Sequence, residues 1–142
     1  MAGSKSNYLE NKILNLVLGA TAYSIPATLY VGLWDSAAGE LTDASTGASA
    51  GEISGNGYAR VAISNNTTTW GSATTDGTRK NAIAITFPTA SGTWGTSVDQ
   101  VAILDATTSG NILYWGDLSV AKVITSGDTA KFDIADIVIT ED

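Results

Sequence analysis

The chain has 142 residues, a net charge of −7 and a pI near 4.2, and it contains neither cysteine nor histidine. Disulfides, zinc–thiolate sites and thiol nucleophiles are therefore excluded, and the commonest general base and metal ligand are missing. The length predicts a single domain over residues 1–142. The seven basic residues are scattered, which argues against a phosphate-binding face and thus against a nucleic-acid partner.

The surface is expected to be polar but weakly charged. Charged residues make up 15% of the chain, whereas ordinary soluble domains have roughly 25%. The longest apolar stretch near the N-terminus, residues 13–22, is interrupted by Asn15 and Gly19 and is too short to cross a bilayer. The polar residues before it are not typical of a signal peptide. We therefore expect contacts with proteins and no membrane partner.

A helix is predicted over residues 7–18. Asn7 and Glu10 form an N-x-x-E arrangement that resembles a capping box, and Gly19 is placed to end the helix in a left-handed conformation. The apolar residues recur at helical spacing and form one stripe: Leu9, Ile13, Leu16 and Val17. Such a helix either closes an open end of the domain, which we favour, or docks on a partner.

The remainder, residues 28–140, predicts about eight short strands. In segment 28–35, Leu29, Val31 and Leu33 alternate with Tyr30, Gly32 and Trp34. Similar strands are expected over 58–64, 81–87, 98–105, 111–118, 119–125, 129–134 and 137–140. Residues 106–110 predict a hairpin loop, and residues 126–128 predict a tight turn. The predicted fold is mainly β: a single antiparallel β-sandwich or jelly-roll-like domain with one short N-terminal α-helix.

Two long polar stretches separate these strands. Residues 36–56 are rich in Ala, Ser, Thr and Gly, and residues 65–80 are rich in Thr, Asn and Gly. Long loops in compact domains are usually functional or flexible. In a structural protein we expect them to be arms that reach neighbouring subunits.

No catalytic, cofactor or metal site is predicted. The acidic residues near the C-terminus, Asp133, Asp136, Glu141 and Asp142, are best interpreted as a solvated rim rather than a catalytic carboxylate pair. Asp35, Glu40 and Asp43 offer oxygen ligands but no calcium-loop spacing.

The aromatic residues allow two interpretations. Trp34, Trp70, Trp94 and Trp115 lie on strands or at strand ends, where large rings fill a core or an interface between subunits. The alternative is a stacking platform for sugars. We favour the core.

Several stretches together resemble a known family. They are SNYLENKILNLVLG at 6–19, PATLYVGLWD at 26–35, EISGNGYARVAI at 52–63, ITFPTASGTWGTSVDQVAILDATTSGNILYWGDL at 85–118 and KVITSGDTAKFDIADIVIT at 122–140. The chain is similar to small virion proteins of tailed phages, cyanophages included, that are labelled phage tail fibre proteins and overlap with capsid cement (head decoration) proteins. The resemblance covers nearly the whole chain except 36–51 and 65–80.

The resemblance implies a non-enzymatic virion structural protein made in the cytoplasm of the bacterial host. A capsid cement protein, which binds and stabilises the lattice of the major capsid protein at the capsid surface, is expected first. The reason is that the chain lacks the repeats of a fibre shaft and an evident anchor separate from a receptor-binding tip. The alternative is a tail or head-fibre appendage that binds host surface glycans.

A cement protein binds in many copies to a symmetric capsid lattice. We therefore expect a homo-oligomer, with a trimer slightly ahead of a dimer. The expected contact residues are Leu9, Ile13, Leu16 and Val17 on the helix, and Gly57, Tyr58 and Arg60 in the following turn and strand. Arg60 could pair with a carboxylate of a neighbouring subunit. An ion pair within its own chain, or an exposed side chain, is the alternative that we favour.

Overall fold

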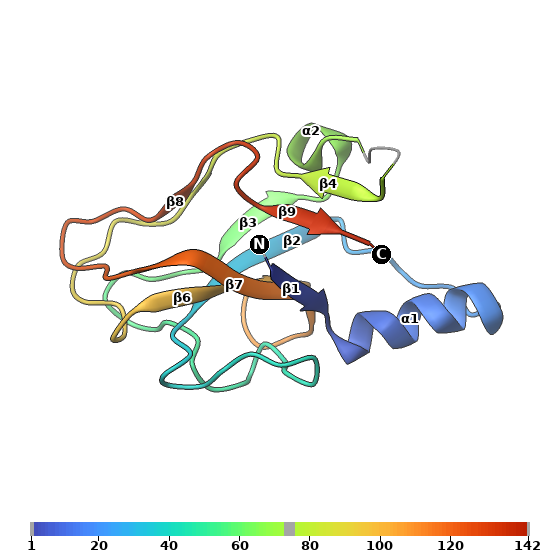
Figure 1. The fold of residues 1–142 in the computed structure, drawn as a ribbon, viewed down its shortest axis with the longest axis horizontal. Helices are drawn as coiled ribbons and strands as arrows, with labels where there is room; N and C mark the ends of the chain where they lie inside the picture. Colours follow the sequence, from blue (N-terminus) through green and yellow to red (C-terminus); the bar gives the residue numbers. More distant parts are fainter. Residues whose placement is uncertain (1, 73–75, 142) are drawn as a thin grey trace.

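The fold is a twisted antiparallel sheet with further layers on both faces. A computed structural model describes residues 2–72 and 76–141. Its elements in chain order are β1 (Ala2–Lys5), α1 (Asn7–Leu18), β2 (Thr28–Trp34), β3 (Val61–Ser64), α2 (Thr67–Trp70), β4 (Thr78–Lys80), β5 (Ile85–Thr86), β6 (Val98–Leu104), β7 (Ile112–Lys122), β8 (Lys131–Phe132) and β9 (Val138–Thr140). The five-stranded sheet has the order β1-β7-β6-β2-β3 (Figure 1).

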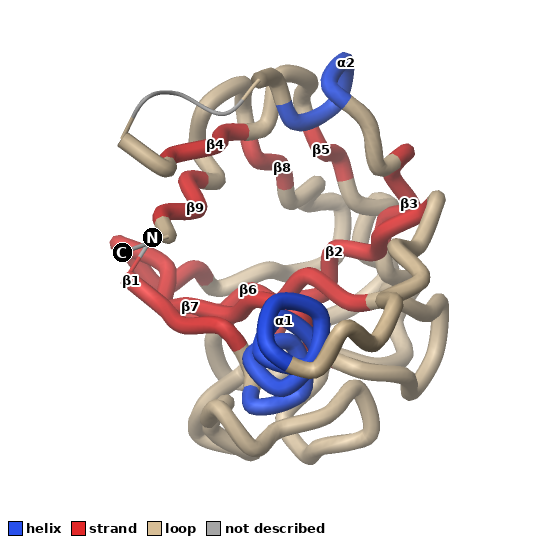
Figure 2. Tube along the Cα trace, turned by 90° about the vertical axis from the view of Figure 1, so that its right-hand side faces the viewer, coloured by secondary structure: helices blue, strands red, loops and turns tan. Residues whose placement is uncertain are grey.

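Two short ribbons, β4-β9 and β5-β8, cover one face of the sheet (Figure 2). Alternate residues of β2 and β6, such as Val31 and Ile103, point into this layer and join the larger core cluster. Aromatic rings fill its centre, where Tyr58 and Phe87 stack at 6.2 Å and Tyr58 meets Trp94 edge-on at 5.3 Å between ring centroids. The predicted mainly β, antiparallel class with one short N-terminal helix is confirmed.

The opposite face of the sheet is buried as well. Trp34, Leu104 and Ile112 form a second cluster with Leu41, which belongs to the long polar stretch 36–56. Backbone bridges pair Trp34 with Glu52 and, across the sheet, Thr46 with Asn111. The expectation that 36–56 is an arm is therefore wrong, because this segment folds back and seals its own sheet.

Several predicted strands are shorter or joined differently. Of the predicted strand 81–87, only β5 forms a strand. Asn81 is buried, and its side-chain amide donates to the carbonyls of Ile83 and Asp133. Segment 119–125 does not begin a new strand, because β7 continues to Lys122. The hairpin loop at 106–110 is confirmed: the Asp105 N–H donates to the Asn111 carbonyl. The turn at 126–128 is confirmed too.

Residues 65–80 contain structure that was not predicted. The short helix α2 begins after Asn66, whose side chain accepts hydrogen bonds from the N–H groups of Thr68 and Thr69. β4 follows and pairs with β9 near the C-terminus. Residues 73–75 of this stretch lie outside the described residues.

Helix α1 has the predicted bounds but different ends. Its N-cap is Ser6, one residue earlier than expected: the Ser6 side chain accepts from the Leu9 N–H and donates to the Ile112 carbonyl. Gly19 at its C-terminus has φ −103°, and the left-handed residue is Ala20 at φ 50°. Gly19 is required for space instead, since a Cβ there would lie 2.9 Å from the Asn15 carbonyl oxygen.

None of the helices in the described part of the chain is long and apolar enough to span a membrane.

Candidate interaction surface

The most exposed apolar surface belongs to the far half of α1. Near the start of the helix, Leu9 is 6% exposed and Ile13 packs against the larger core cluster. Beyond them the helix extends away from the β-layers along the long axis of the molecule (Figure 1). The side chains of this projecting end, residues 14–18, are open to solvent: Leu14 54%, Leu16 50%, Val17 71% and Leu18 81%.

The predicted stripe is thus divided between two roles. Leu9 and Ile13 hold the helix on the domain, whereas Leu16 and Val17 lie outside the core clusters and are largely open to solvent. The interpretation of the helix as a plug that closes the domain does not fit residues 14–18, whose side chains are open to solvent. Burying an aliphatic side chain contributes about 1.5–3 kcal/mol, so an apolar end of this size is typical of a contact surface.

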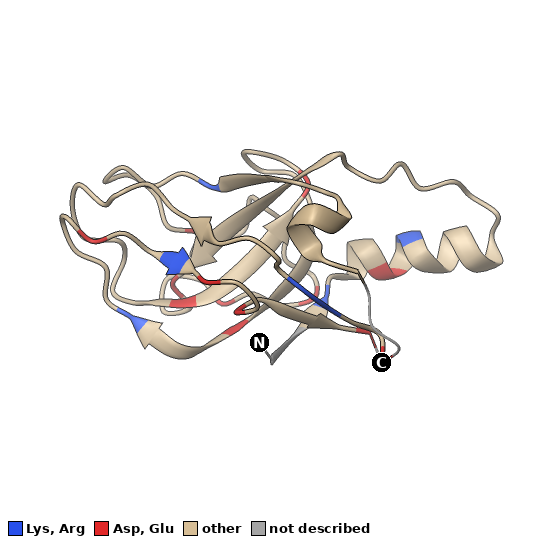
Figure 3. Cartoon of the chain, turned by 90° about the horizontal axis from the view of Figure 1, so that it is seen from above, with Lys and Arg blue, Asp and Glu red and all other residues tan. Residues whose placement is uncertain are grey.

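The projecting end carries no charge. The last charged residue of the helix is Lys12, and its final turn contains no basic side chain (Figure 3). The carbonyl groups that end a helix carry a partial negative charge. A partner surface for this end would therefore be apolar and would have a cation near its edge.

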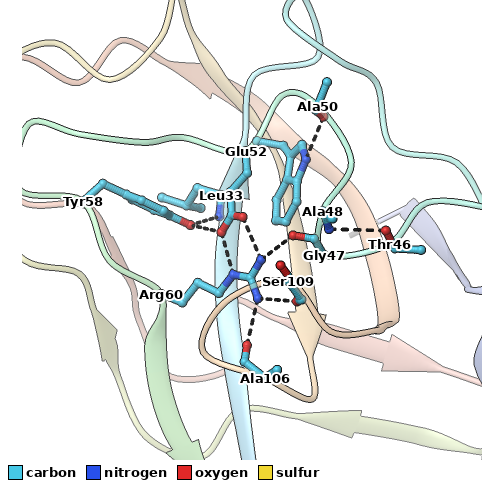
Figure 4. Close-up of polar contacts among 11 residues, drawn as sticks. Leu33, Thr46, Gly47, Ala48, Ala50, Glu52, Tyr58, Arg60, Ala106 and Ser109 are labelled. Carbon is cyan, nitrogen blue, oxygen red and sulfur yellow. Dashed lines mark hydrogen bonds and ion pairs between the residues drawn. The ribbon is translucent and has the colours of Figure 1, made fainter.

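Arg60, predicted as a contact with a neighbour, is instead enclosed by its own chain (Figure 4). Its Nε and Nη2 donate to the two carboxylate oxygens of Glu52 at 2.6 and 2.7 Å. Nη2 also donates to the Gly47 carbonyl, and Nη1 donates to the carbonyls of Ala106 and Ser109, at 2.8 to 2.9 Å. All five guanidinium N–H groups are therefore satisfied, and the side chain is 3% exposed.

These contacts join three loops into one arginine clamp, made of Arg60, Glu52 and the carbonyls of Gly47, Ala106 and Ser109. Close approach of the loops needs a glycine, since a Cβ on Gly47 would lie 1.9 Å from the Ser109 carbonyl oxygen. The intramolecular alternative for Arg60 is thus the one that the structure has.

Tyr58, the neighbouring predicted contact residue, supports the clamp from its other side. Its hydroxyl accepts from the Leu33 N–H at 2.9 Å and donates to Glu52 at 3.1 Å. Burial raises the pKa of Tyr58 far above its ordinary value, so the ring stays neutral and keeps its proton for Glu52. Of the three predicted contact residues Gly57, Tyr58 and Arg60, Gly57 is the one that lies exposed.

Among the described residues, the acidic side chains do not gather into a metal-binding centre. Asp35 accepts from the N–H groups of Thr96 at 2.6 Å and Ala37 at 3.0 Å, while Asp43 accepts from the Trp115 indole. Across the described residues, no group of three acidic side chains lies close enough to hold a metal ion.

The acidic residues near the C-terminus bind separate partners. Asp133 pairs with Lys131, and Glu141 pairs with Lys5. Asp142 lies outside the described residues.

The tryptophans belong to the interior. Trp34 and Trp94 have no exposed surface and Trp70 is 3% exposed, so the core interpretation is confirmed for these three. Trp115 is half-buried, and its indole N–H is held by Asp43. None of the three buried rings is available to stack on a sugar.

An antiparallel β domain with an exposed apolar helix end and an enclosed arginine clamp has the features of a structural protein. A comparison with known protein families agrees: the family described as "Podophage GP4 fiber I protein gp80" matches residues 4–140. The chain belongs to this family, and it is accordingly a phage structural protein. No curated relative matches the chain closely enough to add to this comparison.

Proposed function

We propose that the protein is a non-enzymatic assembly module on the exterior of the phage particle, and that the projecting end of α1 binds its neighbour there. The observation that carries the proposal is the exposure of Leu16, Val17 and Leu18 on a helix that extends from the domain. Four exposed aliphatic side chains in one uncharged helix end favour burial in an assembled particle.

Two positions on the particle use the same contact. In the first, the protein is a capsid cement that clamps the lattice of the major capsid protein, where many modest contacts add up through multivalency. In the second, it is a subunit of a fibre-type appendage, as the printed family description suggests. The projecting helix would serve as an anchor separate from the β domain, and the lack of such an anchor is one of the two sequence arguments against a fibre; the other is the lack of shaft repeats.

The number of copies per particle separates these positions. A cement protein occurs in roughly equal numbers with the major capsid protein, and particles without it lose resistance to heat. An appendage occurs in a dozen copies or a few dozen, by the small number of symmetric attachment sites on a tail or vertex. Quantitative gels of purified particles measure this ratio directly.

The role of the helix is tested by complementing a phage that lacks the gene with a double variant, Val17→Asp and Leu18→Asp. We expect purified particles to carry little or none of this variant, because two charges would have to be buried in an apolar contact. Thr68→Asp, an exposed position on α2, is the matched control and should be incorporated normally. Normal incorporation of the double variant would reject α1 as the contact.

A further inference from the structure

The projecting end of α1 is apolar on two opposite sides. Its residues 14–18 span more than one helical turn of about 3.6 residues. Leu14, Val17 and Leu18 have the spacing i, i+3 and i+4, so they share one face of the helix. Leu16 lies about 200° from Leu14 around the helix axis and therefore points to the opposite side.

Leu16 continues the face that seats the helix on its own domain. Leu9, Ile13 and Leu16 have the spacing i, i+4 and i+7. Leu9 is buried and Ile13 packs against the larger core cluster, but Leu16 is 50% exposed, because the second half of the helix extends beyond the β-layers (Figure 1). Val17 and Leu18 on the other face are 71% and 81% exposed. Both faces of the projecting end are therefore open.

A partner that covers only one of these faces leaves the other in water. A helix that lies on a surface has one apolar face and one polar face, whereas a helix that is apolar on all sides is typically buried on all sides. The projecting end has the second pattern, because Asn15 is the only polar side chain in residues 14–18. The exposed residues 19–22 that follow carry no charge either. This pattern favours a recess that surrounds the helix end over a flat contact.

The end of the helix also needs hydrogen-bond donors from its partner. The N–H groups of Gly19 and Thr21 both donate to the Asn15 carbonyl at 3.0 Å. Among the described residues, no backbone N–H donates to the next three carbonyls, those of residues 16–18. Water satisfies these carbonyls in the free protein, but in a dry recess each unsatisfied carbonyl would cost free energy. A recess that fits this end therefore has apolar walls and offers N–H groups or a cation at its floor.

Neither a second copy of the chain nor a lipid fits this requirement well. The projecting end of a second copy brings the same carbonyl groups and no charged side chain. The groove of a second copy between the distal part of β7 and the segment around β8 is lined by more acidic than basic residues: Asp117, Asp133 and Asp136 against Lys122 and Lys131. Lipid hydrocarbon contains no donors. A different protein is therefore the partner that these observations favour.

From the two apolar faces and the free carbonyl groups together, we infer that the projecting end of α1 inserts into an apolar socket of a different protein of the particle. The socket surrounds residues 14–18 and presents N–H groups or a cation to the carbonyl end. The inference rests on the proposed function, since it names the kind of neighbour that α1 binds. It adds that the contact encloses the helix and that the neighbour is not a copy of the same chain.

The two faces are tested separately by charge. Leu16→Asp places a charge on one face, and Val17→Asp/Leu18→Asp places charges on the other. A socket would bury these charges without partners, so purified particles should lose nearly all of either variant. Thr68→Asp is again the control, and thermal unfolding of each purified variant checks that it folds. Incorporation of a folded Leu16→Asp protein at the wild-type level would overturn the socket.

Cysteine labelling gives a second measurement that introduces no charge. Leu16→Cys and Leu18→Cys place single thiols on opposite faces of a chain that has no cysteine. On intact particles both thiols should react with maleimide at least about tenfold more slowly than in the free protein, the factor that about 1.4 kcal/mol of burial produces. A thiol at position 16 that reacts equally fast in both, beside a protected thiol at position 18, would contradict an enclosing contact.

The identity of the partner is tested by cross-linking on the particle. Leu18→Cys is coupled to a photoreactive maleimide reagent before assembly, and the particles are irradiated. The expected adduct contains a virion protein other than this chain, as determined by peptide mass spectrometry. Cross-linked dimers of this 14.6 kDa chain as the main product would overturn the choice of partner. Binding of wild type, but not of Val17→Asp/Leu18→Asp, to neutral phosphatidylcholine vesicles would overturn it as well.

Failure of this inference is distinguishable from failure of the proposed function. If Val17→Asp/Leu18→Asp is lost from particles while Leu16→Asp is incorporated normally, α1 binds its neighbour through one face and the socket is rejected. If Val17→Asp/Leu18→Asp is incorporated normally, the proposed function itself fails.

Discussion

Arg60 binds Glu52 through both carboxylate oxygens and has 3% of its side chain exposed. Pairs of this kind are costly to break from one side, because the remaining charge stays buried without a partner. Its other three hydrogen bonds go to backbone carbonyls of two loops. The residue therefore acts on the fold through the loops that it joins.

Arg60→Ala should lower the free energy of unfolding by about 3–5 kcal/mol, the range for removing one partner of a buried ion pair. Urea denaturation followed by tryptophan fluorescence measures the change. Lys80→Ala removes a cation from an exposed position and should change stability by less than about 0.5 kcal/mol. Equal effects of the two substitutions would show that the clamp contributes little.

The hydrogen bonds to Asp35 make the stability of the fold depend on pH. The Thr96 N–H, followed by those of Ser97, Ala37 and Ala38, lowers the pKa of Asp35 below its ordinary 3.8, against the opposing effect of burial. Because the folded pKa is the lower one, the ionised carboxylate stabilises the fold above pH 3.8, and this stabilisation disappears as the pH falls through the folded pKa.

Asp35→Asn should therefore be less stable than wild type at neutral pH, and the difference should shrink in acid. Thermal unfolding at a series of pH values checks this, with Glu40→Gln at an exposed position as a control for the loss of one charge. A difference that is constant down to the most acidic conditions would contradict the assignment.

The sequence singles out individual residues but not the groups that they bind. Arg60 stands out in an acidic chain, yet the groups that it binds come from positions 47, 52, 106 and 109. Contacts between separate loops leave no periodic pattern. Nothing in the local sequence therefore distinguishes an arginine that reaches a neighbour from one that is enclosed.

Helix α1 combines a seated half and a projecting half. Leu9 lies in the larger core cluster, and Ser6 connects the helix start to the Ile112 carbonyl. The last turn has no comparable contact, since Leu18 is 81% exposed. The stability of the domain should depend on the first half, and the second half should be free to bind.

Leu9→Ala should destabilise the domain by about 2–5 kcal/mol, the usual cost of a large-to-small change in a core. Leu18→Ala should have an effect within about 0.5 kcal/mol on the unfolding of the dissociated protein. Both values come from denaturation at low protein concentration. A large effect of Leu18→Ala under those conditions would mean that the helix end packs on its own domain.

Periodic elements were predictable and short ones were not. Regular apolar spacing in the sequence predicts the helix over residues 7–18 and the strands β2 and β6. β1 was missed because Ala2–Lys5 has no apolar alternation and is held by its backbone ladder to β7. Of the predicted strand 129–134, two residues remain in β8, and β8 pairs only with β5.

The whole molecule combines a β domain that is packed on both faces of its main sheet with a projecting apolar helix end. The sequence predicted alternating strands in a β-sandwich or jelly-roll-like domain, and β2 and β6 are buried on both faces because segment 36–56 returns over one of them. Three tryptophans and the Arg60 side chain lie inside this packing, whereas the apolar side chains of the projecting end of α1 are open to solvent.

The central claim is that the projecting end of α1 is buried against a neighbour in the phage particle. The chain has no cysteine, so Leu18→Cys introduces a unique thiol whose modification rate reports its exposure. The account predicts slow maleimide labelling on intact particles and fast labelling of the dissociated protein, while Thr68→Cys labels fast in both. A thiol at position 18 that reacts equally fast on particles and in free protein would contradict the account.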